Sequence, residues 1–397
     1  MKKPVRLTYI QQHFALPSEA GFVRPWEFAR RLQRDGYSVT VVRGGPQNAE
    51  TVLEGVRIRT VAAPYANEMS FRRRIVSFLQ FLVKASVETI RSRPAIVLAS
   101  STPLTVAIPA ILASIRPSTR FIFEVRDLWP EVPVKLGLVT NRYVIWAAKM
   151  LEKLTYRRAD AIVALSPYME QGVLKVAPGA RTVVIPNGCD LAEFDDAMTD
   201  RESIREQLGV GTDEKLVVYA GGFGFLYDLP RCVELAARLA PDGVRFTFIG
   251  KGSESEKLKE LADELGISRE GLFPGIMPKR EVIRFLKASD AILSPLRSAP
   301  VLEGCSLNKV FDSMAAGRPV LMNHGGWLAD AVTAIEAGWR IPTDPSLAAE
   351  VVREILADTD ELERRGKNNR ALGESKFSRD DQYDSLFNLV SSLATRN

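Results

Sequence analysis

Residues 303–321 read EGCSLNKVFDSMAAGRPVL, and this stretch combines the start, the body and the end of a helix with the strand that follows. Ser306 is a favourable N-terminal cap, and Gly317 stands where a helix C-terminus favours glycine. Lys309 and Asp312 fall one turn apart on the predicted helix. A helix N-terminus attracts phosphate, a lysine adds positive charge, and a carboxylate can accept hydrogen bonds from a ribose diol. The stretch therefore predicts a nucleotide-diphosphate site, unless Lys309 and Asp312 only form a solvated ion pair.

The alternation of a short apolar strand with a longer helical segment extends outward from this stretch through the chain. Such alternation is typical of parallel βαβ units. Strands are expected at Val5–Ile10, Ser38–Val42, Ile96–Ser100, Phe121–Val125, Ala161–Leu165, Thr182–Ile185, Lys215–Ala220, Arg245–Gly250, Ala291–Ser294 and Pro319–Met322. Helices are expected at Arg24–Arg34, Arg72–Ser92, Arg142–Arg158 and residues 380–394. The predicted fold is α/β, with two doubly wound, Rossmann-like domains.

The boundary between the two domains is expected in the sequence IPNGCDLAEF, where a Pro-Asn-Gly turn follows an apolar strand. The prediction is an N-terminal domain over residues 1–190 and a C-terminal domain over 191–375. A last helix, over 376–397, is expected to pack back on the first domain. Doubly wound sheets bind ligands beyond the carboxyl ends of their strands, so the cleft between the domains is the expected site.

Composition and length exclude several classes of protein. The 397 residues, 46% of them hydrophobic, are enough for two buried cores. The three cysteines are widely spaced and form no CxxC pair, which excludes a disulfide framework or a cysteine zinc site. No apolar run approaches the roughly 18 residues that span a bilayer, and we expect neither a signal peptide nor a transmembrane helix. A cytoplasmic protein is therefore predicted.

Charge is distributed unevenly along the chain. Residues 1–190 contain 27 Lys and Arg against 14 Asp and Glu, a net charge of +13, whereas residues 191–397 contain 26 against 34, a net charge of −8. This asymmetry indicates an anionic partner for the first half, either a membrane surface or a nucleic acid, unless it is an accident of surface charge.

One segment of the basic half favours the membrane. Within FRRRIVSFLQFLVK, basic residues lie beside apolar ones; they are Arg72, Arg73, Arg74 and Lys84, with Ile75, Phe78, Leu79, Phe81 and Leu82. This pattern suits a helix at an anionic membrane surface, and the alternative is an amphipathic helix packed on the core. We expect reversible attachment to the inner face of the cell membrane and no nucleic-acid partner.

The opening stretch belongs to a larger set of motifs: PWEFARRLQRDGYSVTVV, FEVRDLWPE, ALSPYM, IPNGCD, VVYAGGFG, FIGKGSE and LFPGIMPKREV. Together they resemble the GT-B glycosyltransferases, specifically the retaining family 4 enzymes that build bacterial surface polysaccharides. The family pattern reads roughly E-G-x-x-P-S-K-x-x-E-x-M-A-x-G, and Glu303, Lys309 and Asp312 occupy its charged positions. Asp312 departs from the family glutamate, and the loop GGFGFLYD lacks the arginine with which many relatives hold the diphosphate.

The resemblance and the positions of residues after strands give three groups of candidates. The catalytic candidates are Asp127, Arg126, Glu303 and Lys309. The donor-binding candidates are Gly21, Gly222, Gly224, Lys251, Ile276, Arg297, Ser306, Leu307 and Asp312. The acceptor candidates are His13, Trp129 and Glu131, because charged groups orient hydroxyls while an aromatic ring covers an apolar face of a sugar. His324 also follows a strand. For the exposed Lys251, and for Arg126, Asp127 and His13, a purely structural role is the alternative.

The resemblance implies retaining transfer of a sugar from a UDP-linked donor, an N-acetylated amino sugar, to a lipid-linked saccharide. No D-x-D signature stands where a metal-bridging site would be expected, so no metal and no cofactor beyond the donor are expected. One alternative is an isomerase resembling UDP-N-acetylglucosamine 2-epimerases, which would need several acid–base histidines, whereas the chain has only His13 and His324. A non-catalytic sugar-binding or nucleic-acid-binding protein is the other alternative.

Overall fold

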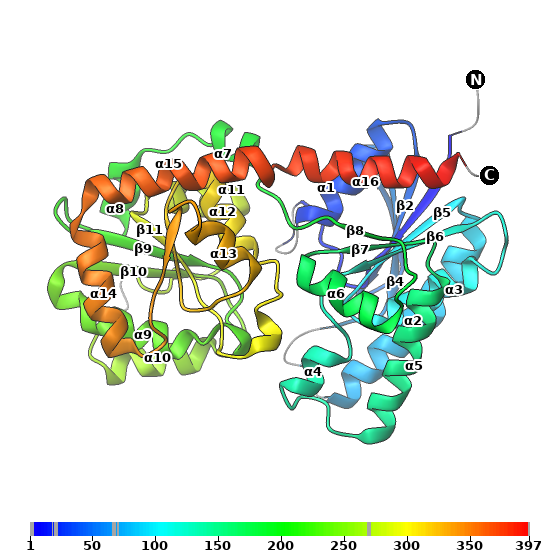
Figure 1. The fold of residues 1–397 in the computed structure, drawn as a ribbon, viewed down its shortest axis with the longest axis horizontal. Helices are drawn as coiled ribbons and strands as arrows, with labels where there is room; N and C mark the ends of the chain where they lie inside the picture. The colour runs from blue at the N-terminus through cyan, green and yellow to red at the C-terminus, as the bar shows by residue number, and fades with distance from the viewer. Residues whose placement is uncertain are drawn as a thin grey trace. The chain divides into compact units, whose positions relative to one another are not determined.

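The computed structural model describes residues 4–17, 19, 23–65, 69, 71–267 and 271–395. The chain divides into two compact units, each an α/β domain (Figure 1). The first unit consists of Met1–Pro186, Gly304–Ser306 and Gln382–Asn397, and the second of Asn187–Glu303 and Leu307–Asp381. The predicted class, two Rossmann-like α/β domains with parallel sheets, is confirmed.

The first unit contains an eight-stranded sheet. Its spatial order is β3 (Ala49–Leu53), β4 (Val56–Ala62), β2 (Ser38–Gly45), β1 (Arg6–Ile10), β5 (Ile96–Ser100), β6 (Arg120–Val125), β7 (Ala161–Ala164) and β8 (Thr182–Val184). All neighbours are parallel except β3 and β4, which form an antiparallel hairpin. Because β1 lies between β2 and β5, the order of strand addition reverses beside β1, and ligands of such sheets bind at that switch point.

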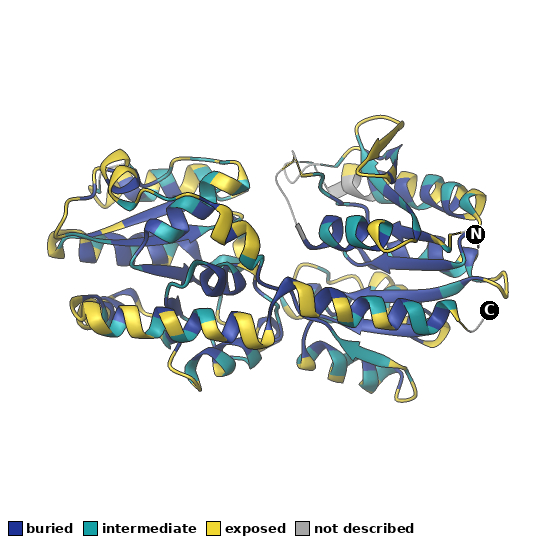
Figure 2. Ribbon diagram, turned by 90° about the horizontal axis from the view of Figure 1, so that it is seen from above, coloured by how far each residue is buried: buried dark blue, intermediate teal, exposed yellow. Residues whose placement is uncertain are grey.

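Helices cover both faces of this sheet. One face carries α1 (Val23–Arg34) and α16 (Arg379–Ala394); the other carries α2 (Phe71–Ser92), α3 (Ala107–Ala113), α5 (Arg142–Arg158) and α6 (Pro167–Val176). Alternate strand residues contribute to opposite cores: Leu7 and Tyr9 pack with α1 and α16, whereas Ile10 packs on the other side. The central strands β1, β5, β6 and β7 are consequently buried on both faces (Figure 2).

The second unit contains a five-stranded parallel sheet in the order β10 (Val244–Ile249), β9 (Lys215–Ala220), β11 (Ala291–Ser294), β12 (Val320–Met322) and β13 (Gly338–Arg340). One face carries α9 (Leu229–Leu239), α10 (Ser255–Glu264) and α14 (Pro345–Ala357); the other carries α8 (Arg201–Gln207), α11 (Lys279–Ala288), α12 (Asn308–Ala316) and α15 (Thr359–Lys376). Three short helices, α4 (Glu131–Lys135), α7 (Leu191–Asp196) and α13 (Trp327–Thr333), lie in connections. The switch point of this sheet lies between β9 and β11.

The opening stretch folds largely as predicted, with one correction. Gly317 ends α12 in the left-handed conformation with φ of 64°, as expected. The prediction that Ser306 caps this helix is wrong, because α12 begins at Asn308 and Leu307 is the N-cap residue, with no side-chain cap. Leu307 is buried, and burial of this apolar side chain fixes the start of the helix. No helix among the described residues is long and apolar enough to cross a membrane.

A buried ion pair joins α1 to the middle of the first sheet. The Arg24 guanidinium donates to Glu124 Oε1 from Nε at 3.1 Å and from Nη2 at 3.0 Å, and both side chains are about 2% exposed. Arg24 also donates to the backbone oxygens of Ile185 and Pro186, at the end of the unit. Ser100 Oγ donates to Glu124 Oε2 at 2.5 Å. This network therefore ties β5, β6 and α1 to the last residues before the second unit.

Replacing Glu124 with Gln should lower the free energy of unfolding of the first unit by about 3 to 5 kcal/mol, because the Arg24 charge would stay buried without its counter-ion. Chemical denaturation of the full chain measures this value. The matched control is Glu50→Gln, which removes the charge of an exposed ion pair with Arg57 and Arg59 and should cost less than about 1 kcal/mol. Equal effects of the two substitutions would contradict the importance assigned to the buried pair.

Candidate functional site

The candidate donor site lies at the carboxyl edge of the second sheet, around its switch point. The loops after β9, β10, β11 and β12 carry the predicted residues Gly222, Gly224, Lys251, Arg297 and His324. Helix α12 follows the loop after β11, so its N-terminus and Lys309 lie at the same edge. The structure therefore brings most of the predicted donor-binding residues to one edge of one domain.

Glycines allow the loops after β9 and β10 to pack backbone against backbone. A Cβ atom on Gly250 would lie 1.9 Å from the Gly221 carbonyl oxygen, and one on Gly252 would lie 2.3 Å from that of Phe223. Gly221 N donates to Ile249 O at 2.9 Å, and Phe223 N donates to Lys251 O at 3.0 Å. The backbone N–H of Gly222 donates no hydrogen bond among the described residues. The loop after β9 is thus held in place by backbone hydrogen bonds, and it offers the Gly222 N–H as a donor.

Lys309 reaches the end of β9 and lies on two aromatic rings. Its side chain is buried, and Nζ lies 3.6 Å from the ring centroid of Tyr227 and 4.9 Å from that of Tyr219. A Cβ atom on Gly221 would lie only 2.8 Å from Lys309 Cε and 3.0 Å from Nζ, so a glycine here leaves space for the ammonium group. Attraction between the cation and the ring faces stabilises the charge in this position.

Asp312 does not pair with Lys309, which corrects the alternative considered from sequence. Its Oδ1 atom accepts a hydrogen bond from Lys279 Nζ at 2.7 Å, and Lys279 lies at the start of α11. Burial alone would lower the pKa of Lys279, but the carboxylates of Asp312 and Asp190 raise it above its usual value. Lys279 is therefore charged at neutral pH, and it holds Asp312 through one oxygen only.

The other donor candidates occupy the rim of this edge. Arg297 donates from Nε to Phe225 O at 3.0 Å and stacks on the Phe225 ring at 3.8 Å, so it clamps the loop after β9. Lys251 and Ile276 are exposed, and Gly275, which precedes Ile276, pairs with Ile249 at the end of β10. Burial lowers the pKa of His324, so this histidine is neutral at pH 7.

Glu303 is exposed, and it lies beside Gly325, which belongs to the loop that follows β12. A Cβ atom on Gly325 would lie 3.4 Å from Glu303 Oε1 and 3.2 Å from a terminal nitrogen of Arg340. Sequence reasoning did not identify Arg340, or the tyrosines beneath Lys309, because each comes from a strand or loop remote in sequence from the 303–321 stretch. Arg340 is the last residue of β13, and its position at the carboxyl end of a short strand was the available signal.

A second cluster lies on the first unit, at the carboxyl ends of β1 and β6. His13 follows β1 and packs against Tyr65, with ring centroids 4.4 Å apart and the two rings tilted by 52°. Burial, together with the nearby Arg126 charge, lowers the pKa of His13 to about 4, so the imidazole is neutral at pH 7. Burial raises the pKa of Asp127 to about 6, although Arg126 opposes this shift. A histidine and a carboxylate with displaced pKa values beside an arginine are typical of a functional site.

Two glutamines in this cluster were missed by sequence reasoning. Gln11 and Gln12 directly follow β1 and are about 2% exposed. Their side-chain oxygens, and Nε2 of Gln12, have no hydrogen-bond partner among the described residues. The sequence signal was present, because two consecutive amides directly follow an apolar strand. Buried amides with unused hydrogen-bonding capacity suit a ligand rich in hydroxyls.

The remaining acceptor candidates differ in their surroundings. Trp129 is half-buried and packs against the core beneath α2, α3 and α5. Glu131 starts α4, and its Oε1 atom accepts from Lys135 Nζ at 2.5 Å, which engages it in a local ion pair. Gly21 lies outside the described residues. No group of three or more His, Cys, Asp or Glu side chains that could hold a metal ion occurs in the part of the chain that the structure describes.

Two family models match separate parts of the chain. Residues 23–188 match the family model described as "Glycosyl transferase 4-like domain", and residues 200–372 match "Glycosyl transferases group 1". Among curated proteins, the putative colanic acid biosynthesis glycosyl transferase WcaI of Escherichia coli K12 is 24% identical over 160 residues, 39% of each chain. The chain spans about half the length of the curated relatives it matches.

Solved structures extend the likeness over the whole fold. Sucrose-phosphate synthase from Thermosynechococcus elongatus matches with a TM-score of 0.81 at 18% identity, covering 99% of this chain and 100% of that one. HepE from Anabaena, in complex with UDP and glucose, matches with a TM-score of 0.73 at 17% identity, covering 98% and 100%. These similarities show that the two Rossmann-like domains have the fold of GT-B glycosyltransferases.

The raised pKa of Asp127 indicates that its ionised carboxylate lowers the stability of the folded protein at neutral pH. A neutral side chain of the same shape should remove this cost. Between the unfolded value near 3.8 and the folded value of about 6, the folded protein binds more protons, so this group makes stability fall as pH rises through that window. Asp127→Asn should therefore raise the free energy of unfolding at pH 7 by about 1 to 2 kcal/mol and give no gain below pH 4. Thermal unfolding from pH 4 to 8 tests this, and a variant less stable at pH 7 would oppose it.

Proposed function

We propose that this chain, which is built from a glycosyl transferase 4-like domain and a glycosyl transferases group 1 domain, transfers a sugar from a nucleotide diphosphate donor to an acceptor hydroxyl. The observation that carries the proposal is the position of Lys309. Its ammonium group lies at the switch point of the second sheet, beside a glycine loop and at the first turn of α12. A diphosphate placed there meets a buried cation, backbone donors and the positive end of a helix.

The donor is held, in this proposal, by several groups of the second unit. Lys309 and Arg297 neutralise the diphosphate, and this replaces the arginine that the loop after β9 lacks. Asp312 accepts a ribose hydroxyl through the oxygen that Lys279 does not engage. Glu303 contacts the transferred sugar. A UDP-linked donor is favoured because the structurally similar HepE was solved with UDP and glucose, and we propose an N-acetylated amino sugar as the transferred group.

Transfer breaks the bond between the sugar C1 and the diphosphate, and negative charge develops on the departing nucleotide. Fixed donors and cations aimed at that charge stabilise the transition state more than the ground state. Lys309 is suited to this role because its surroundings already hold it in place. Arg126 and Asp127, on the first unit, are proposed to orient the acceptor. Retention of configuration at C1 is part of the proposal through the resemblance to family 4 enzymes.

An isomerase related to UDP-sugar 2-epimerases is a weaker candidate. Such a reaction removes and returns protons and requires acid–base groups that titrate near neutral pH. Burial lowers the pKa of both histidines of the chain, to about 4 for His13. This leaves Asp127, with a pKa of about 6, as the candidate of its cluster that titrates near neutral pH, whereas such a reaction needs more than one acid–base group. Release of free nucleoside diphosphate in proportion to acceptor separates transfer from isomerisation and from simple binding.

We propose a lipid-linked saccharide acceptor at the inner face of the cell membrane, because the sequence motifs resemble those of enzymes that build bacterial surface polysaccharides. The expected apolar stripe needs correction: Phe81 is buried, Phe78 stacks on Tyr65, and Lys84 donates to Ala62 O at 2.7 Å. Side chains of Arg72, Arg74 and Ile75 lie outside the described residues. The apolar residues exposed on α2 are Val76, Leu79, Val83, Val87 and Ile90, and those on α5 are Tyr143, Val144, Trp146, Met150 and Leu154.

These exposed residues define a membrane face with basic neighbours. Arg73, Arg142, Lys149 and Lys153 are exposed on the same two helices. Helix α3 contacts both α2 and α5, and it adds exposed Leu112 nearby. Basic side chains attract anionic lipid, and the apolar ones enter the interfacial region.

Lys309→Met should weaken UDP binding by about 1.5 to 3 kcal/mol, because it removes the cation and keeps an unbranched side chain on the tyrosine rings. The thermal stability of the second unit should not fall, since a buried charge is replaced by an apolar group. Titration calorimetry with UDP measures the effect, and Lys251→Met, at an exposed position, is the matched control. Wild-type affinity in Lys309→Met would overturn the placement of the donor.

The membrane face predicts that Leu79→Glu combined with Val83→Glu lowers binding to anionic vesicles roughly tenfold or more, because two inserted apolar groups become charged. Both residues are more than half exposed, so the fold should be kept. Co-sedimentation at low and high salt measures binding. Leu265→Glu with Leu347→Glu, on the second unit, makes the same charge change at exposed leucines and should have little effect. A wild-type chain that stays in the supernatant at low salt would exclude this attachment.

A further inference from the structure

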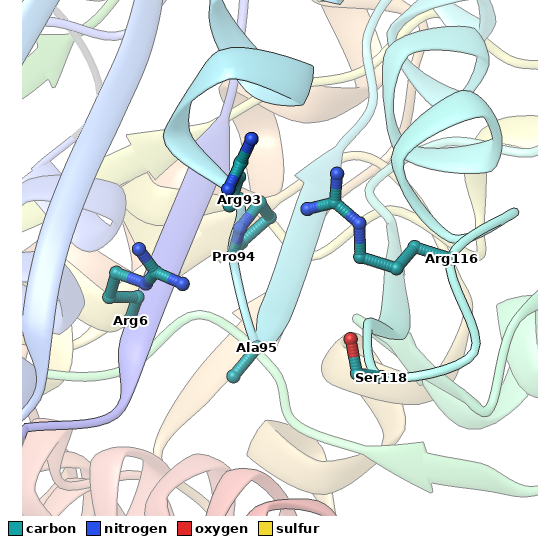
Figure 3. A pocket seen from close by; sticks show the side chains of 6 residues that line it. All are labelled: Arg6, Arg93, Pro94, Ala95, Arg116 and Ser118. Carbon is teal, nitrogen blue, oxygen red and sulfur yellow. The ribbon is translucent and has the colours of Figure 1, made fainter.

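A pocket at the amino edge of the first sheet is lined by three arginines (Figure 3). Arg6 is the first residue of β1, Arg93 belongs to the turn that leads into β5, and Arg116 lies in the turn before β6. The remaining lining residues are Pro94, Ala95 and Ser118. The cavity volume is about 570 Å³. Because His13 and Asp127 follow the carboxyl ends of β1 and β6, this pocket lies at the opposite edge of the same sheet.

Hydrogen bonds fix the three segments that form the pocket. Ala95 N donates to Arg6 O at 2.9 Å, and Arg120 N donates to Ala95 O at 2.8 Å. Thr119 Oγ1 is buried and donates to Pro94 O at 2.8 Å. The arginine side chains therefore project from backbone segments that are hydrogen-bonded at the edge of the sheet. In Figure 3 the three side chains surround Pro94 and Ala95, with Ser118 beside Arg116.

The charge in this pocket is uncompensated within the described residues. None of the lining residues is acidic, and the guanidinium groups of Arg6, Arg93 and Arg116 make no ion pair or side-chain hydrogen bond there. The nearby Arg120 is different, because it pairs with Asp160 at 3.2 Å. Three like charges around one cavity repel each other, whereas a multivalent anion bound between them would be attracted to all three.

We propose that Arg6, Arg93 and Arg116 bind a phosphate group, as a phosphomonoester or a diphosphate, at a site separate from the donor site. Guanidinium groups match phosphate oxygens in bidentate geometry, and three of them can surround one tetrahedral anion. The phosphate is either a free anion or the terminal phosphate of a lipid headgroup, and both have the same recognition chemistry. This proposal does not depend on the proposed function.

Titration calorimetry of the full chain with sodium pyrophosphate tests the free anion. Excess UDP is present throughout, so that pyrophosphate does not report on a nucleotide site of the second unit. We expect one pyrophosphate per chain, and affinity roughly tenfold or more weaker in the Arg6→Gln, Arg93→Gln, Arg116→Gln variant. Arg116→Gln alone should show a smaller loss. The control variant is Arg34→Gln, Arg57→Gln, Arg238→Gln, which removes the same charge from exposed positions and should bind as the wild type does.

Vesicles test the lipid source. Wild-type and variant chains are sedimented with vesicles containing phosphatidic acid, which ends in a phosphomonoester, or an equal charge of phosphatidylglycerol, which has no terminal phosphate. Preference for phosphatidic acid that the triple variant loses assigns the site to a headgroup, whereas pyrophosphate binding without that preference assigns it to a free phosphate. If the triple variant matches the wild type with both pyrophosphate and phosphatidic acid, or the wild type binds neither, the proposal is wrong.

Discussion

The ion pair between Arg24 and Glu124 organises the carboxyl edge of the first unit, and the acceptor candidates depend on it. Burial acts to raise the pKa of Glu124, but the Arg24 and Arg126 charges lower it below its usual value, so the carboxylate stays ionised. Tyr9, on β1, and Ser100, on β5, donate to the same carboxylate. The residues that directly follow these strands thus leave the sheet from fixed positions. A buried pair of this kind is costly if either partner is lost, but intact it defines one arrangement of three strands and a helix.

The second unit places its cation in a different way. Lys309 lies on the faces of two tyrosines, and Asp312, one turn further along α12, is held by Lys279 from another helix. This separation places the ammonium group at the end of β9, and it leaves one oxygen of Asp312 for other partners. The glycines of the neighbouring loops are part of the same arrangement, because a side chain on Gly221 would occupy the space next to the lysine.

The strands whose residues are buried were predictable from sequence, because burial requires a run of apolar residues. Strands such as Ile96–Ser100 are buried throughout and gave a clear apolar run, whereas β3 and the antiparallel pairing it makes were missed because every residue of β3 is exposed. The candidate site was predictable where residues follow strands or match a family pattern. Which side chains pair with each other was not predictable from sequence, since the interaction of Asp312 with Lys279 joins residues 33 positions apart on different helices. The exposed side of α2 was also misjudged, because periodicity alone does not decide which apolar residues face the core.

The position of α16 has a consequence for biosynthesis. Tyr383, Leu386, Leu389 and Val390 lie in the same core as α1 and the strands at the centre of the first sheet. The first unit is therefore composed of segments that precede and follow the second unit in the sequence. Domains usually fold as they leave the ribosome, in order from the N-terminus. Here the second unit has all of its residues first, and the first unit must wait, with one face of its sheet incompletely covered, until α16 has been translated.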